Sequence, residues 1–250
     1  IVMLRPDIKV LKSAFKYKIT IILGTNRRWY HWLYANKLVS LSRKNASLHE
    51  MQLNGKLLTP MHIYQPKHLE AYAKYYGLIK PSVDVSALFN ASKQYRLVIH
   101  PKSKGSAREW PLQNYLKVVE GLAQLGNVQI LLTGTEAEGN AIAQQCPELY
   151  HHPQVTNLTG KLLLVELMSV IAQSDALLAC STGPLHIAAA YGILAIGLYP
   201  PLRPMHPGRW APVGKRVLVN VKADGCAAPC VPSSCACMRW ISTDMVLNQV

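Results

Sequence analysis

Acidic residues and long hydrophobic runs are both scarce in this chain of 250 residues. Only 13 residues are Asp or Glu, against 27 Lys and Arg, so the formal net charge is +14. No apolar run approaches the ~20 residues of a membrane-spanning helix, and nothing has the pattern of a signal peptide. Internal repeats and low-complexity tracts are also missing. Because neither a membrane-spanning run nor a signal peptide is found, we expect a soluble protein. Half of the residues are hydrophobic, which is enough for the cores of two domains.

The positive charge is concentrated near the start of the chain. The first 49 residues contain ten Lys and Arg residues and a single acid, Asp7. Nucleic acid, an anionic membrane surface and a phosphorylated glycolipid would each suit such a segment, and a solvated basic face would explain it without a partner. The RNP, zinc-finger and recognition-helix patterns of nucleic-acid binders are missing, which disfavours nucleic acid.

Aromatic residues directly follow two of these cations, in the run Arg27-Arg28-Trp29-Tyr30-His31-Trp32. Such a cluster would suit a bilayer interface or the face of a sugar ring. An aromatic patch that packs into the core beneath a basic helix fits the same residues. The sequence leaves both alternatives open.

The most informative motif lies between residues 176 and 190. Residues 176–180 form a short apolar run, as expected for a buried parallel strand. The turn and helix start that follow read Ser181-Thr182-Gly183-Pro184-Leu185-His186. Thr182 can cap the helix, Gly183 lets the backbone approach a ligand, and Pro184 suits the first turn. Unpaired N–H groups there favour a phosphate, and His186 could point at a diphosphate, although a capped helix without a ligand fits the same residues.

A second candidate phosphate loop follows the strand predicted at residues 95–100. It reads His100-Pro101-Lys102-Ser103-Lys104-Gly105-Ser106-Ala107-Arg108. Ser103, Lys104, Ser106 and Arg108 carry donors suited to phosphate oxygens, and an arginine can bind two oxygens at once. Residues 112–125 then have the apolar spacing of a helix. A solvated basic loop is the alternative interpretation.

Taken together, the two loops resemble the donor-binding domain of glycosyltransferase family nine, the heptosyltransferases of lipopolysaccharide core synthesis. The match is carried by His100-Pro101, by residues 108–111 and by residues 181–190. Four further segments agree in order with that family: residues 128–138, 157–160, 197–200 and 209–214. The resemblance covers residues 95–250.

This resemblance implies an α/β protein of the GT-B type, in which two Rossmann-like domains face a cleft. Polar turn sequences at residues 80–94 predict a domain boundary. We therefore expect residues 1–85 to form a partial acceptor-side domain and residues 90–250 the donor-binding domain. Residues 24–32 and 48–54 of this chain resemble the second half of the family's acceptor domain. The first half of that domain, with the catalytic base, is therefore expected before Ile1. No catalytic base is assigned in this chain.

The resemblance also implies an inverting, metal-independent transferase that needs no cofactor. Its donor would be a nucleotide sugar such as ADP-heptose, and its acceptor a lipopolysaccharide core or a related glycolipid. Such an enzyme would lie in the cytoplasm, peripheral to the inner membrane. An inactive family member that binds nucleotide or lipid is the alternative. The phosphate-binding set is Ser103, Lys104, Arg108, Ser181, Thr182, Gly183, Pro184, Leu185 and His186.

Two acidic residues near Gly134 are candidates for contact with the nucleoside. Glu138, or otherwise Glu136, could accept from the ribose hydroxyls, as an acidic residue does in other Rossmann sites. A carboxylate that stabilises a helix N-terminus fits both positions too. Where many family members carry Asp before Thr-Gly, this chain has Ser181, which puts the recognition of the donor sugar's hydroxyls, and heptose itself, in question.

Six cysteines raise the question of a metal. Cys226, Cys230, Cys235 and Cys237 lie within twelve positions, but their spacing lacks the paired C-x-x-C knuckles of zinc sites. Disulfides or free thiols fit this loop equally well. Cys146 and Cys180 have the sequence surroundings of packed core residues.

Overall fold

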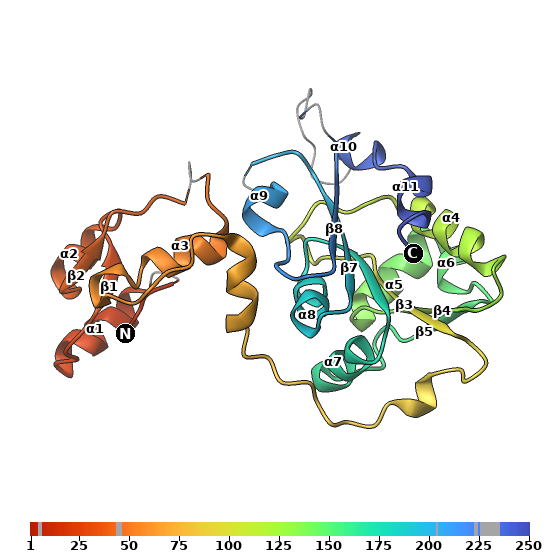
Figure 1. The fold of residues 1–250 in the computed structure, drawn as a ribbon, viewed down its shortest axis with the longest axis horizontal. Helices are drawn as coiled ribbons and strands as arrows, with labels where there is room; N and C mark the ends of the chain where they lie inside the picture. Colours follow the sequence, from red (N-terminus) through yellow and green to blue (C-terminus); the bar gives the residue numbers. More distant parts are fainter. Residues whose placement is uncertain (5–6, 44–46, 204, 223–224, 226–235) are drawn as a thin grey trace. The chain divides into compact units, whose positions relative to one another are not determined.

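The structure is a computed structural model that describes the chain apart from residues 5–6, 44–46, 204, 223–224 and 226–235. It divides into an N-terminal unit, Ile1–Tyr72, and a C-terminal unit, Ala73–Val250 (Figure 1). The division lies earlier than the predicted boundary at residues 80–94. Val83, Val85 and Leu88 explain the difference, because these side chains pack into the core of the C-terminal unit.

The N-terminal unit contains a small parallel sheet. Strand β1 (Leu23–Thr25) pairs with β2 (Lys37–Val39), and Val2 forms a parallel bridge with Leu23. Asp7 caps the first helix by accepting from the N–H groups of Lys9 and Val10. The helical segments are α1 (Ile8–Lys16), α2 (Trp29–Tyr34), α3 (Glu50–Lys56), the 3-10 turn Thr59–Met61, and the 3-10 segment Leu69–Tyr75, which crosses the division after Tyr72.

The C-terminal unit is built on six parallel strands in the order β5-β4-β3-β6-β7-β8. Their bounds are β3 (Tyr95–His100), β4 (Val128–Leu132), β5 (Val155–Asn157), β6 (Ala176–Cys180), β7 (Leu194–Tyr199) and β8 (Val217–Val221). β4 and β6 are buried along their whole length. β6 is a continuous apolar run, as expected in a sheet covered on both faces, whereas β4 includes the buried polar residue Gln129. The expected strands at residues 95–100 and 176–180 are confirmed.

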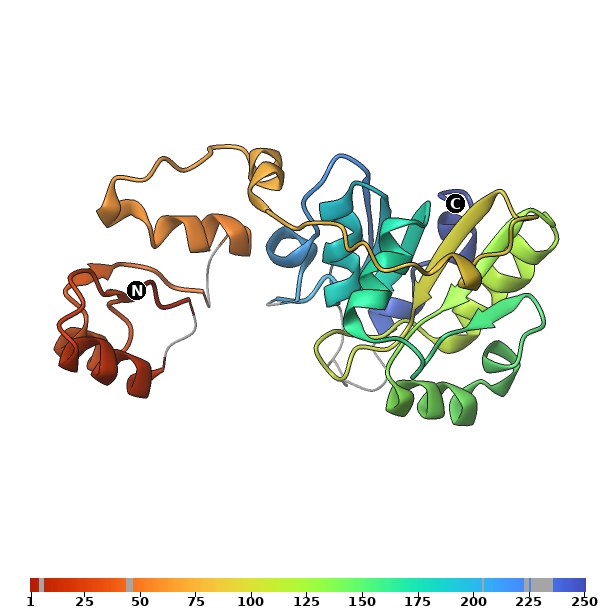
Figure 2. The ribbon, with the colours of Figure 1, turned by 90° about the horizontal axis from the view of Figure 1, so that it is seen from below.

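Helices cover both faces of this sheet (Figure 2). Leu97 and Ile99 face one core with the side chains of α4, while Val98 faces a second core with those of α7 and α8. This alternation is the pleat of a strand. The helices are α4 (Leu112–Ala123), α5 (Glu136–Gln145), α6 (Pro147–Tyr150), α7 (Leu164–Ala172), α8 (Gly183–Tyr191), α9 (Pro207–Trp210), α10 (Ala236–Arg239) and α11 (Thr243–Leu247), with a 3-10 turn at Ser86–Leu88.

The order of the strands determines where a ligand can bind. From β3 the chain builds outward through β4 and β5, then returns to place β6 on the other side of β3. The direction of winding therefore reverses between β3 and β6. In open parallel sheets, ligands bind beside the carboxyl ends of the strands at such a reversal.

Candidate functional site

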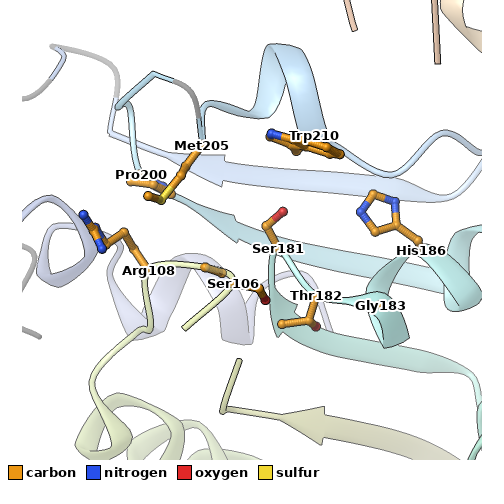
Figure 3. Close-up of a pocket in the computed structure, with 10 residues that line it drawn as sticks. Ser106, Arg108, Ser181, Thr182, Gly183, His186, Pro200, Met205 and Trp210 are labelled. Carbon is orange, nitrogen blue, oxygen red and sulfur yellow. The ribbon is translucent and has the colours of Figure 1, made fainter. Parts of the chain in front are cut away.

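Two loops leave the sheet at this reversal and form a pocket. The loop after β3 carries Arg108, and the turn after β6 leads into α8. A cavity of about 290 Å³ lies among them (Figure 3). Its lining consists of Ser106, Ala107, Arg108, Ser181, Thr182, Gly183, His186, Pro200, Met205 and Trp210. Arginine and histidine are present in this set and acidic residues are not, so the described lining is suited to an anion.

The N-terminus of α8 opens onto this pocket. Thr182 is the N-cap residue, with the expected extended backbone, but its side chain makes no capping hydrogen bond. Its buried Oγ1 has no partner among the described residues. A Cβ placed on Gly183 would meet nothing within 4 Å, so the backbone there is open to a ligand. The expected capping by Thr182 is wrong, and the N–H groups that it would have paired are left for another acceptor.

The cationic loop presents only part of its predicted donor set to the pocket. Arg108 lines it, and its Nε atom is buried without a partner among the described residues. Ser103 is buried and donates instead to Glu109 Oε1 at 2.9 Å. Lys104 has a φ of 48° and precedes Gly105 with a φ of 78°, a left-handed turn that puts this lysine at the exposed loop tip. Neither Ser103 nor Lys104 is part of the lining.

The remaining predicted residues of the turn have different positions. His186 and Ser181 line the pocket. Leu185 is fully buried, and its side chain packs in the core beneath α8. Pro184 occupies the first turn of the helix, as predicted. Pro184 and Leu185 therefore form part of the first turn of α8. Of the two, only Leu185 has a backbone N–H that could donate to a bound anion.

Cys180, the last residue of β6, contacts the end of the loop that carries Arg108. The backbone N–H of Trp110 donates to the Cys180 Sγ atom at 3.3 Å, and the Tyr115 hydroxyl lies 3.7 Å from the same sulfur. Burial raises the pKa of the Cys180 thiol to about 11, so it remains protonated at neutral pH. The predicted packed role of Cys180 is confirmed, with a contact that also fixes the end of the Arg108 loop against the turn before α8.

A polar cluster lies at the ends of β3 and β4, beside Gly134. The Thr133 hydroxyl lies 3.2 Å from the Ile99 carbonyl and 3.0 Å from His100 Nδ1, within hydrogen-bonding distance of both. Burial lowers the pKa of His100 and the charge of Glu138 opposes that shift. Its second ring nitrogen, Nε2, can make a further hydrogen bond.

Glu138 itself is engaged in capping α5. Its Oε2 atom accepts from the backbone N–H of Thr135 at 2.8 Å and from the Thr135 hydroxyl at 2.9 Å. A Cβ on Gly134 would lie 3.3 Å from Glu138 Cβ, so the glycine gives this side chain room. The helix-capping interpretation of Glu138 is confirmed. Its Oε1 atom makes no hydrogen bond within the described part of the chain.

Comparison with known proteins identifies the family. The sequence profile of glycosyltransferase family 9 (heptosyltransferase) matches residues 12–241. The chain belongs to this family. The lipopolysaccharide core heptosyltransferase OpsX of Haemophilus influenzae is 27% identical over 192 residues, which are 76% of this chain and 53% of that protein. The chain therefore spans about half the length of this curated relative.

Solved structures of family 9 members share the α/β fold of this chain. The ADP-heptose lipopolysaccharide heptosyltransferase II of E. coli is 18% identical, with a TM-score of 0.67 over 97% of this chain and 72% of that one. The E. coli heptosyltransferase WaaC with ADP is 17% identical, with a TM-score of 0.56 over 86% and 59%. The expected α/β fold of GT-B heptosyltransferases and the resemblance drawn from the two loops are both confirmed.

The described part of this family 9 chain has neither a cluster of metal-binding side chains nor a helix that could span a membrane. Within the described residues, no group of three or more His, Cys, Asp or Glu side chains could hold a metal ion. Of the cysteine-rich loop, Cys226, Cys230 and Cys235 lie outside the described residues, and Cys237 is buried in the core. In the same part of the chain, no helix is both long and apolar enough to cross a membrane.

Sequence reasoning missed several residues of the pocket. Pro200, Met205 and Trp210 come from the segment after β7, far in sequence from both loops. The sheet order supplies the reason, because β7 neighbours β6 and its carboxyl end lies beside the turn before α8. The family resemblance had marked residues 197–200 and 209–214 as matching segments, and this was the available signal.

Proposed function

We propose that this chain carries the nucleotide-sugar site of a glycosyltransferase that transfers a sugar, heptose from ADP-heptose, to a lipopolysaccharide core or a related glycolipid. The observation that carries the proposal is the convergence of Arg108 and the uncapped start of α8 on one pocket whose described lining holds no acid. Family membership supports the class of reaction. WaaC, a fold relative, has been solved with ADP, a diphosphate nucleotide.

The chemistry that this pocket can perform is stabilisation of a leaving diphosphate. As the bond from the sugar to the diphosphate breaks, negative charge grows on the phosphate oxygens. Arg108 would pair with that charge, and the first N–H groups of α8 would donate to the same oxygens. Preorganised donors of this kind act where the charge develops, which lowers the barrier to departure. Inversion at the sugar carbon follows if one acceptor hydroxyl displaces the diphosphate directly.

The ribose would lie toward the cluster beside Gly134. Glu138 Oε1 can accept from a ribose hydroxyl while Oε2 keeps its two bonds to Thr135. His100 Nε2 offers a further hydrogen-bonding group on the neighbouring strand. The capping role and the ribose role of Glu138 are therefore compatible, because they use different oxygens.

We predict that ADP binding does not need a divalent metal. Arg108 and the helix N-terminus already supply the positive charge that a metal ion would bring to the diphosphate. In calorimetric titrations, this chain should bind ADP with the same affinity in EDTA as in magnesium. Binding that disappears in EDTA and returns with magnesium would contradict the proposal.

Contact with an anionic membrane surface is the proposed role of the positively charged N-terminal unit. Residues 1–72 contain twelve Lys and Arg residues and three acids. Arg27 and Arg28 are exposed, and Trp29 and Trp32 beside them are 68% and 64% exposed, which favours the interface interpretation of the aromatic run. His31, by contrast, is fully buried. Arg43 is paired with Glu50 at 2.6 Å, so it is less suited to a membrane contact, and Lys44 lies outside the described residues.

Replacing Arg27 and Arg28 together with Gln should weaken binding to anionic liposomes by roughly 1–2 kcal/mol at low salt, because each cation near such a surface contributes about 1 kcal/mol. Added salt should release the unchanged protein, since the Debye length is only ~10 Å at 0.1 M. Cosedimentation with vesicles measures both effects. The matched control replaces the exposed Lys117 and Lys215 of the C-terminal unit with Gln. An equal loss of liposome binding in the two double variants would favour the solvated-face interpretation. Equal binding of the unchanged protein to neutral and anionic vesicles would favour it too.

A further inference from the structure

A second cavity, of about 470 Å³, lies within the N-terminal unit. Helix α1 ends at Lys16 and leads into β1, while α2 ends at Tyr34 and leads into β2. The lining comes from these two connections, residues 15–22 and 33–36. Because β1 and β2 are parallel, the cavity lies beside the amino ends of both strands. Arg27 and Arg28, by contrast, follow the carboxyl end of β1.

Apolar side chains that line this cavity are exposed. Phe15 and Ile19 lie at the end of α1 and just after it, and Leu33 lies on α2. The Phe15 ring packs edge-to-face on the ring of Tyr34, with centroids 5.7 Å apart. Exposed apolar side chains gathered around a cavity and bordered by charge mark a surface that binds an apolar partner.

The wall of the cavity between the two connections is held by one amide side chain. Asn36 Oδ1 accepts from the Ile22 N–H at 2.9 Å, and Asn36 Nδ2 donates to the Thr20 carbonyl at 2.8 Å. The two segments that enter β1 and β2 are therefore tied together. The charge in this lining comes from two lysines, Lys16 and Lys18, and the lining contains no Asp or Glu.

Lys18 occupies a backbone position that usually takes glycine. Helix α1 ends in a Schellman motif, in which the Ile19 N–H donates to the Ala14 carbonyl at 3.0 Å and the Lys18 N–H to the Phe15 carbonyl at 3.1 Å. Lys18 is the left-handed residue of this motif, with a φ of 54°. That conformation strains any residue with a Cβ, and departures from local preference are expected where function requires a side chain. Here the side chain belongs to the lining of the cavity.

No carboxylate competes for the two cations. Neither Lys16 nor Lys18 forms a salt bridge within the part of the chain that the structure describes. Residues 8–49 contain no Asp or Glu at all. Two cations beside an exposed apolar cavity complement a molecule with an anionic head and an apolar chain.

We propose that this cavity binds an anionic phospholipid of the membrane, with an acyl chain among Phe15, Ile19 and Leu33 and the phosphate beside Lys16 and Lys18. The inference rests on the proposed membrane contact of the N-terminal unit and names the site that holds the lipid. The acyl chain is stabilised by leaving water, and the phosphate by the two cations. The cavity shares no residue with the nucleotide pocket, so lipid and nucleotide bind independently.

Calorimetric titration with short alkyl phosphates separates binding in the cavity from attraction to surface charge. Octyl phosphate should bind the unchanged chain, and butyl phosphate should bind roughly tenfold or more weakly, because each methylene that leaves water strengthens binding about fourfold. Lys18→Gly removes the cation and suits the left-handed backbone, so this variant should fold and bind octyl phosphate roughly fivefold more weakly. Leu33→Gln should shrink the difference between the two alkyl phosphates.

Two matched controls lie outside the cavity. Lys9→Gln removes an exposed cation from the first turn of α1, and Leu125→Gln removes an exposed leucine from the C-terminal unit. Both variants should bind octyl phosphate as the unchanged chain does. Equal affinity for octyl and butyl phosphate, or equal losses in Lys18→Gly and Lys9→Gln, would overturn the inference.

Cosedimentation with vesicles of phosphatidylglycerol and phosphatidylcholine then tests whether the cavity serves at a membrane. Lys18→Gly and Leu33→Gln should each bind these vesicles more weakly than the unchanged chain, with ADP affinity unaltered. Vesicle binding that is the same in both variants and in the unchanged chain would overturn the inference and leave the proposed membrane contact standing. Failure of the unchanged chain to bind the vesicles would contradict the membrane contact itself, and this inference with it.

Discussion

Replacing Arg108 with alanine is expected to weaken ADP binding by about 1.5–3 kcal/mol, or roughly 10- to 150-fold. The guanidinium lines the pocket, and its Nε atom has no partner among the described residues. A diphosphate would supply the missing acceptor, and the bond would be strengthened by the charge on both groups. Calorimetry on folded variant protein measures the loss directly.

Two controls separate this contact from a general effect of charge. Lys117→Ala removes one exposed cation from α4 and should leave the ADP affinity within error. Lys104→Ala should cost much less than Arg108→Ala, because Lys104 lies at the exposed loop tip, outside the lining. Unchanged affinity in Arg108→Ala would remove this loop from the site. A larger loss for Lys104→Ala than for Arg108→Ala would place the diphosphate elsewhere on the loop.

Replacing Trp110 with alanine is expected to destabilise the C-terminal unit by about 3–5 kcal/mol, the usual cost of truncating a buried aromatic side chain. Trp110 is 1% exposed, packs edge-to-face on Tyr115, and donates its indole N–H to the Ile241 carbonyl at 3.1 Å. The change would leave a cavity and an unpaired carbonyl. Urea denaturation followed by circular dichroism measures the difference.

Trp240 offers a control of the same chemical type. It is 69% exposed, and its ring interacts with Lys222 at 4.9 Å. Trp240→Ala should cost less than about 1 kcal/mol, since surface changes away from special contacts have small effects. Similar destabilisation in the two variants would show that Trp110 does not hold the structure together as its contacts indicate.

The sequence predicted the core of the candidate site because that part depends on local patterns. An apolar run followed by Ser181-Thr182-Gly183-Pro184 identifies a strand end and a helix start without knowledge of the rest of the fold. Arg108 could be proposed from its loop for the same reason. Arg108, Ser181, Thr182 and Gly183 all line the pocket in the structure.

The parts that could not be predicted depend on backbone geometry and on the order of the strands. Ser103 looked like a ligand donor until the structure placed Glu109 beside it. Lys104 turns outward because the backbone is left-handed at its position, which no pattern of charges reveals. Trp210 joins the site only because β7 lies next to β6.

A crystal structure of this chain with ADP would show whether the pocket holds the diphosphate. We expect the diphosphate to lie in the pocket, with its oxygens within hydrogen-bonding distance of the Arg108 guanidinium and of the backbone N–H groups at the start of α8. The ribose should lie toward Glu138 and Gly134. Density for ADP at another place on the C-terminal unit, with Arg108 and the α8 N-terminus free of phosphate, would overturn the proposed site.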